Sequence, residues 1–124
     1  MEKLITINLS YYNQPKDVIL KHIDYWNSYD KYTKRKFTFF IIDDCSKIPI
    51  NELLKGVYFK NLDIHYYRVQ KDLKYNIGGV RNLGAKECKT PWIVILDMDT
   101  LVSPKMAKEL VDLAENNNNK NVAF

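Results

Sequence analysis

The amino-acid sequence predicts an α/β fold, namely a Rossmann-like, open and mainly parallel sheet flanked by helices. Short apolar runs alternate with longer amphipathic segments along the 124 residues, which is the pattern of consecutive βαβ units. Polar side chains also follow three of the apolar runs directly. In an open parallel sheet such positions lie at the carboxyl ends of the strands, where ligands bind.

The first half of the chain is predicted to contain a strand, a helix and a second strand. Residues 4–9 read as the first strand, and the proline that follows suits the first turn of a helix. Ile19, Ile23 and Trp26 recur at helical spacing and are expected to form the buried stripe of that helix. Residues 37–42 are almost continuously apolar, which is typical of a strand covered on both faces.

The alternation continues in the second half. A short helix is expected near residues 51–55, and residues 64–69 are a more polar candidate for a third strand. A second long helix is expected to begin near Ile77, after which residues 92–96 form the clearest strand.

A third long helix is predicted after that strand, because Ser103 and Pro104 place a serine cap before a proline in the first helical position. Its apolar stripe is predicted to consist of Met106, Leu110 and Leu113. Residues 122–124 read as the start of another strand. We therefore expect residues 1–124 to form a single domain that is truncated, the chain stopping inside the larger fold.

Composition favours a globular protein of the cytoplasm. The two cysteines stand far apart, which argues against a disulfide framework or a zinc site and fits a reducing compartment. No signal-peptide core and no apolar run of membrane-spanning length are visible. The net charge of +4 suits an anionic ligand without selecting one.

A basic run, residues 31–36, lies between the first helix pattern and the second strand pattern. We interpret it as a solvated loop, with a contact to phosphate, a membrane or nucleic acid as the alternative. No basic helix, aromatic RNA-binding signature or zinc-finger spacing supports nucleic acid as a partner.

The strongest chemical signal is the pair Asp97 and Asp99, directly after the clearest strand. An extended backbone points side chains two residues apart to the same side. Hard carboxylate oxygens of this kind suit Mn²⁺ or Mg²⁺, which usually keep waters and add substrate phosphates. A metal or ribose role is therefore predicted for both residues.

Polar residues also follow the first two strands: Ser10 and Tyr11 after the first, Asp43 and Asp44 after the second. One topology would gather them with the Asp97 pair in a single crevice. Taken alone, Asp43 and Asp44 are also compatible with simple capping of a turn. The alternative role for a carboxylate there is to accept hydrogen bonds from a base ring N–H.

Two further features open the second long helix. The pair Gly78 and Gly79 either forms an ordinary turn or lets an anionic ligand approach free backbone N–H groups. Arg81 is either a phosphate clamp or a partner in a surface ion pair. His22 and His65 are interpreted as structural, because they fall within the first helix pattern and the third strand pattern. Cys45 is disfavoured as a nucleophile, since the sequence shows no activating partner for it.

Together these motifs resemble family-2 glycosyltransferases of the GT-A fold, the nucleotide-diphospho-sugar transferase type. The matching segments, in order along nearly the whole chain, are Ser10-Tyr11-Tyr12-Asn13, Asp43-Asp44-Cys45-Ser46, Asn76-Ile77-Gly78-Gly79-Val80-Arg81-Asn82-Leu83-Gly84 and Trp92-Ile93-Val94-Ile95-Leu96-Asp97-Met98-Asp99. Four ordered motifs are far more specific than any one of them.

The resemblance implies roles for individual residues. Ser10 and Asp44 would contact the nucleotide base, with Asp44 pairing to the uracil edge of a UDP-sugar. Arg81 would lie near the base or the diphosphate. Asp97, the first aspartate of the DXD motif, would bind ribose and the metal shell, and Asp99 would coordinate Mn²⁺ or Mg²⁺ directly.

The resemblance implies a nucleotide-sugar donor and an acceptor that is a glycan, a lipid or a protein. Such enzymes carry a second half that shapes the acceptor site and supplies the catalytic base, and no residue of this chain is nominated for that role. The first alternative is a catalytically inactive module that binds nucleotide or pairs with another chain or a second copy of itself. The second is a nucleotidyltransferase, which is disfavoured because a glycine-rich, arginine-bearing loop is missing after the first strand.

Overall fold

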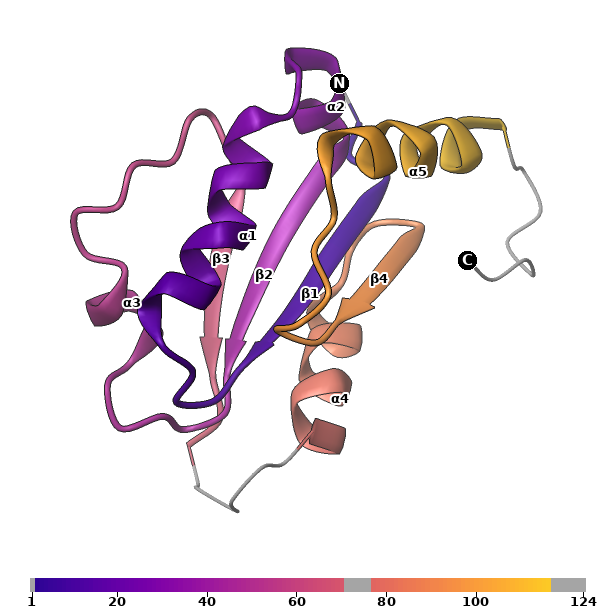
Figure 1. The fold of residues 1–124 in the computed structure, drawn as a ribbon. Coiled ribbons are helices and arrows are strands. Elements are labelled where there is room, and N and C mark those ends of the chain that lie inside the picture. Colours follow the sequence, from indigo (N-terminus) through magenta and orange to yellow (C-terminus); the bar gives the residue numbers. More distant parts are fainter. Residues whose placement is uncertain (1, 71–76, 117–124) are drawn as a thin grey trace.

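The computed structural model describes residues 2–70 and 77–116, which form an α/β domain with helices on both faces of a parallel sheet (Figure 1). The elements follow in the order β1 Ile5–Tyr11, α1 Lys16–Ser28, α2 Lys31–Lys36, β2 Phe37–Asp43, α3 Ile50–Leu53, β3 Ile64–Arg68, α4 Ile77–Glu87, β4 Trp92–Leu96 and α5 Pro104–Asn116. The predicted fold class is confirmed.

The sheet has the strand order β3-β2-β1-β4, and every neighbouring pair is parallel. The chain builds outward from β1 to β3, and α4 then returns it to the other side of β1, where β4 pairs. The direction of winding thus reverses between β1 and β4. A reversal of this kind opens a crevice at the carboxyl ends of the two strands, since their connections leave in opposite directions.

The central strand β2 is buried along its whole length, as its apolar sequence predicts. On one face of the sheet, Ile7 and Phe39 join the main core with Ile23 and Trp26 of α1 and Val111 of α5. The predicted buried stripe of α1 is confirmed, and the Trp26 ring stacks on Phe39 with their centroids 4.5 Å apart.

The opposite face of the sheet carries a smaller core beneath α4. Phe40 and Ile42 of β2 pack there with Val80 of α4. Beside them β1 presents polar residues: Thr6 and Asn8 are fully buried, and Ser10 comes next on the same face. The crevice side of β1 is therefore polar although the strand lies in the interior.

Helix α4 approaches this polar face of β1 closely because it carries a glycine at the contact. A Cβ atom added to Gly84 would lie 2.4 Å from Oδ1 and 2.5 Å from Nδ2 of Asn8. Both amide atoms of Asn8 are buried without a hydrogen-bond partner among the described residues. The Gly84 contact thus sets the distance between α4 and the sheet.

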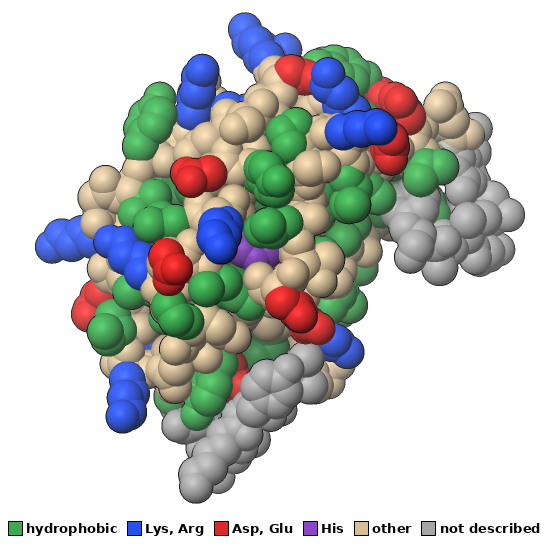
Figure 2. All heavy atoms as spheres, in the orientation of Figure 1, with side chains coloured by type: hydrophobic (Ala, Val, Ile, Leu, Met, Phe, Trp, Pro, Cys, Tyr) green, Lys and Arg blue, Asp and Glu red, His purple; other side chains and the backbone are tan. Residues whose placement is uncertain are grey.

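The basic run at 31–36 is not the loop that the sequence suggested but a short helix, α2. Asp30 caps it, since its Oδ1 accepts a hydrogen bond from the Thr33 backbone N–H at 2.8 Å. Figure 2 shows lysine and arginine side chains gathered at the end of the molecule where Figure 1 places α2. The capping aspartate, three residues before Thr33, was the missed signal.

The predicted apolar stripe of α5 is wrong at two positions. Met106 is 44% exposed and Leu113 is 51% exposed, whereas Ala107, Val111 and Ala114 are buried. Small side chains let α5 lie close to α1 and α2, so the buried face follows the alanines instead of the larger residues. Leu110 packs at the margin of the core, as predicted.

The strand predicted at 122–124 lies outside the described residues. Within residues 2–70 and 77–116, none of the helices combines the length and the apolar character needed to cross a bilayer.

We predict that Gly84→Ala destabilises the chain by about 1–3 kcal/mol, because the new methyl group overlaps the Asn8 side chain. Urea denaturation measures the effect. Gly78→Ala is the matched control: its added Cβ meets nothing within 4 Å, so it should be neutral or stabilising by up to about 1 kcal/mol. Adding Asn8→Ala should restore part of the stability that Gly84→Ala removes. If the double variant is as unstable as Gly84→Ala alone, overlap with the Asn8 side chain is not the cause.

Candidate functional site

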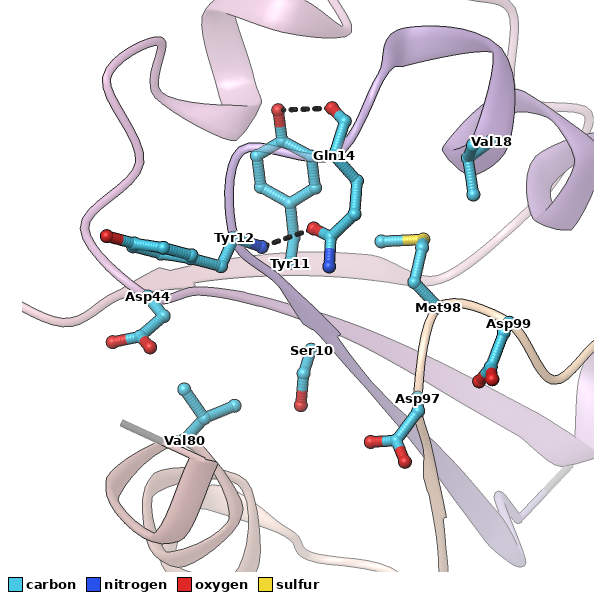
Figure 3. A pocket seen from close by; sticks show the side chains of 10 residues that line it. All are labelled: Ser10, Tyr11, Tyr12, Gln14, Val18, Asp44, Val80, Asp97, Met98 and Asp99. Atoms are coloured by element: carbon cyan, nitrogen blue, oxygen red, sulfur yellow. Dashed lines mark hydrogen bonds between the residues drawn. The ribbon is translucent and has the colours of Figure 1, made fainter. Parts of the chain in front are cut away.

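A pocket of about 370 Å³ lies at the carboxyl ends of β1 and β4, at the winding reversal (Figure 3). The structure brings most of the predicted site residues into it. Its lining consists of Ser10, Tyr11, Tyr12, Gln14, Val18, Asp44, Val80, Asp97, Met98 and Asp99. Figure 3 shows the hydroxyl of Ser10 and the carboxylates of Asp44 and Asp97 directed to the side on which Val80 lies.

The loop after β1 forms one wall of the pocket. The Tyr11 hydroxyl donates a hydrogen bond to the Gln14 carbonyl at 3.1 Å, and the Gln14 side chain accepts one from the Tyr12 backbone N–H. Burial, and secondarily the nearby charge of Asp43, raises the pKa of Tyr11. The phenol therefore stays neutral and its hydroxyl is committed to holding the loop.

Asp43 does not line the pocket, in contrast to its neighbour Asp44. Its carboxylate is fully buried and accepts hydrogen bonds from the backbone N–H groups of Ser46 at 2.8 Å and Ile50 at 3.0 Å. The Arg68 guanidinium donates to the same carboxylate at 2.7 Å and to the Ser46 carbonyl at 2.8 Å. Asp43 thus fixes the loop after β2, which is the turn-capping alternative.

This loop is also bonded to the loop after β1. The Asp44 backbone N–H donates to the Tyr11 carbonyl at 2.9 Å, and the Asn13 N–H donates to Ser46 Oγ at 3.0 Å. Asn13 Oδ1 in turn accepts from the Lys47 N–H at 2.9 Å. Asn13 and Cys45 both have positive φ angles, near 55°, so each loop turns sharply. Asp44 is presented to the pocket from this rigid pair of loops.

Asp97 and Asp99 stand where β4 ends. An extended backbone is expected there from the sequence, but the structure has a tight turn in which the Thr100 N–H donates to the Asp97 carbonyl at 3.1 Å. Both carboxylates line the pocket nonetheless. Arg81 of α4 lies beside them, with its Nη2 atom 3.6 Å from Asp97 Oδ1, and both side chains are about half exposed.

His22 of α1 stabilises this turn through a hydrogen bond to its backbone. The ring is fully buried, and its Nε2 lies 2.7 Å from the carbonyl oxygen of Met98, the residue between the two aspartates. Because a carbonyl only accepts, Nε2 carries the proton. Burial lowers the pKa of His22, against the opposing effect of this hydrogen bond, so the neutral ring is the form that holds the turn. The histidine is structural, as predicted, but it serves the site.

The predicted glycine pair falls in the first turn of α4. Gly79 does not line the pocket, whereas its neighbour Val80 does. Val80 is buried in the core under α4 and also lines the pocket, so the position of this helix determines part of the pocket wall.

The donor set at the end of β4 fits a hard divalent cation. Among residues 2–70 and 77–116, no group of three histidine, cysteine, aspartate or glutamate side chains is close enough to enclose a metal ion by itself. Two exposed carboxylates on one turn are an incomplete shell. Mg²⁺ and Mn²⁺ suit such a shell because they retain waters and take oxygens from substrate phosphates.

Several residues of the site were not predicted from the sequence. Arg68 and His22 act through long-range contacts with Asp43 and Met98, for which the sequence offers no local signal. Gln14, Val18 and Met98 line the pocket because they adjoin predicted residues or face them from α1.

Comparison with known proteins agrees with this geometry. Residues 6–124 match the model of the family described as glycosyl transferase family 2. A fold with a parallel sheet and a pocket at its winding reversal, joined to this match, defines the class: the chain belongs to glycosyl transferase family 2. It is also 36% identical over 73 residues to the chondroitin synthase of Escherichia coli. That similarity covers 59% of this chain and 10% of the relative.

We predict that the free energy of unfolding falls as the pH drops below about 6.5, because the unfolded chain takes up a proton at His22 that the folded chain resists. Urea denaturation between pH 8 and pH 5 measures the slope. His22→Gln, which keeps an N–H donor, should flatten it. At pH 8 the ring is neutral in both states, so a difference there reports its packing and its hydrogen bond to Met98 and not its titration. An equal slope in the variant would assign the effect to another group.

Proposed function

We propose that this chain is the donor-binding half of a glycosyltransferase and binds a nucleotide-sugar, in first place a UDP-sugar, with Mn²⁺ or Mg²⁺. The observation that supports this proposal is the convergence of Ser10, Asp44, Asp97 and Asp99 in one pocket at the winding reversal. Membership of the family supports sugar transfer as the reaction.

The pocket divides into two chemically different ends. At the β2 end, Asp44 is held by the paired loops and offers a carboxylate to the N–H of a base, with Ser10 beside it. The Tyr12 side chain borders the same end (Figure 3) and suits a flat ring. At the β4 end, Asp97 and Asp99 offer oxygens to ribose and to the metal shell.

Arg81 lies within reach of an anion held beside Asp97, since the two side chains are 3.6 Å apart and half exposed. We assign it to the diphosphate of the donor. Asp97 and Asp99 would hold Mn²⁺ or Mg²⁺, whose positive charge would offset the charge developing on the departing diphosphate. The bond between the anomeric carbon and the diphosphate oxygen breaks, and the acceptor oxygen forms the new bond and releases its proton.

We infer a glycan acceptor ahead of a lipid or a protein, because the relative with 36% identity is a chondroitin synthase. No base for the acceptor proton is assigned to this chain. We propose that residues 1–124 form a donor domain that needs further structure for catalysis.

Calorimetric titration of UDP is the first test. We predict binding that requires Mn²⁺, and we expect Asp99→Asn to weaken it at least about tenfold, because the metal loses a charged ligand. Asp24→Asn, an exposed aspartate on α1, is the matched control and should bind as the unaltered chain does. Unchanged binding in the Asp99 variant would refute the metal assignment.

The base contact is tested separately by Asp44→Asn. The ring N3 of uracil is a donor and that of cytosine is an acceptor. A neutral amide oxygen accepts more weakly than a carboxylate and the amide N–H can donate to cytosine, so the substitution should weaken UDP by about tenfold while sparing CDP. Competition between UDP, CDP and GDP on each variant measures the preference. If all three nucleotides lose affinity equally, Asp44 does not read the base.

A further inference from the structure

A second cavity lies at the opposite end of the sheet from the candidate donor site. Its volume is about 640 Å³, and it is formed by α2, the residue that caps it and the loop before β3. The lining consists of Tyr29, Asp30, Lys31, Lys34, Arg35, Lys60 and Asn61. Four of these seven side chains are cationic and one is acidic.

The positive charges of this cavity are not neutralised by the described residues. The single acid of the lining, Asp30, is committed to capping α2 and to an ion pair with Lys108, 3.2 Å away on α5. Lys36, one residue beyond the cavity, shows the usual arrangement, since its Nζ lies 3.6 Å from a Glu115 oxygen. Among the ion pairs of residues 2–70 and 77–116, none involves the four cations of the lining.

Lys34 is the residue that a solvated surface does not explain. It is only 7% exposed, and its ammonium donates a hydrogen bond to the Lys60 carbonyl at 2.9 Å. An ammonium has three donors, and burying it beside another cation is unfavourable without an anion. Desolvation, followed by the nearby charge of Lys60, lowers the pKa of Lys34.

We propose that this cavity binds a phosphate-bearing ligand, either a soluble phosphate ester or the headgroup of an anionic lipid. Lys34 forms the floor of the site, while Lys31, Arg35 and Lys60 are exposed around it. Tetrahedral oxyanions accept several charge-assisted hydrogen bonds at once, which matches convergent ammonium and guanidinium donors. Figure 2 shows the corresponding end of the molecule rich in lysine and arginine. This proposal is independent of the function proposed for the donor pocket.

The test is a titration of inorganic phosphate into the 124-residue chain without divalent metal, at constant ionic strength set with sodium chloride. Backbone ¹H–¹⁵N spectra should show saturable shifts at residues 30–35 and 60–61. The double variant Lys31→Gln/Arg35→Gln, in which both changes are exposed, should weaken binding about tenfold. Lys55→Gln/Lys105→Gln removes the same charge from other exposed positions and should change the affinity less than about twofold.

Absence of saturable shifts around the cavity would overturn the proposal, and so would equal weakening in the two double variants, which would reveal a response to net charge only. Because the affinity is measured from the signals of residues 30–35 and 60–61, it reports on this cavity and not on the donor pocket. Vesicles of phosphatidylcholine with and without phosphatidylglycerol identify the source. If the anionic vesicles capture the chain and added phosphate releases it, the ligand is a lipid headgroup. If phosphate binds but the vesicles do not capture the chain, the ligand is a soluble phosphate ester.

Discussion

The buried carboxylate of Asp43 organises the end of the sheet on which the site depends. It lies in the interior with no exposed surface, and its partners are two backbone N–H groups and the Arg68 guanidinium. A buried charge is tolerable only when it is paired and hydrogen-bonded in this way. By fixing the loop that carries Ser46, Asp43 indirectly fixes the loop after β1, to which Ser46 is bonded. Asp43 therefore stabilises the loop after β2, whereas its neighbour Asp44 lines the pocket.

The same division appears at the other end of the pocket. Asp97 and Asp99 are exposed and line the pocket, with Asp97 beside Arg81, while the backbone between them is held by the buried His22. A site made of exposed carboxylates on an unsupported turn would lose much of its binding energy to ordering the turn. The neutral imidazole removes that loss without adding charge beside the aspartates.

The sequence allowed the fold class and half of the ten residues that line the pocket to be predicted, because both depend on local patterns. The strands at 37–42 and 92–96 are marked by apolar runs, and the aspartates follow them directly. The contacts that hold the site could not be predicted from the sequence, because Arg68 and His22 contact residues that are distant along the chain. The exposure of Met106 and Leu113 could not be predicted, because side-chain size matters less for the buried face of α5 than the close approach that Ala107 and Ala114 permit. The helix at Lys31–Lys36 was not predicted, because its run of basic residues is also typical of a solvated loop, although Asp30 before it is a typical capping residue.

The pairing of β4 with β1 has a consequence for how the chain acquires its site. Thr6 and Thr90 share a hydrogen bond across a sequence separation of 84, and His22 reaches Met98 across 76 residues. Contacts of such range form late and slowly, because a long loop must close before they contribute. A nascent or partly folded chain can complete α1, β2 and β3 and still lack the β4 wall of the pocket. The pocket is therefore complete only in the fully folded domain, and a ligand that bound there would favour the folded chain over every partly folded form.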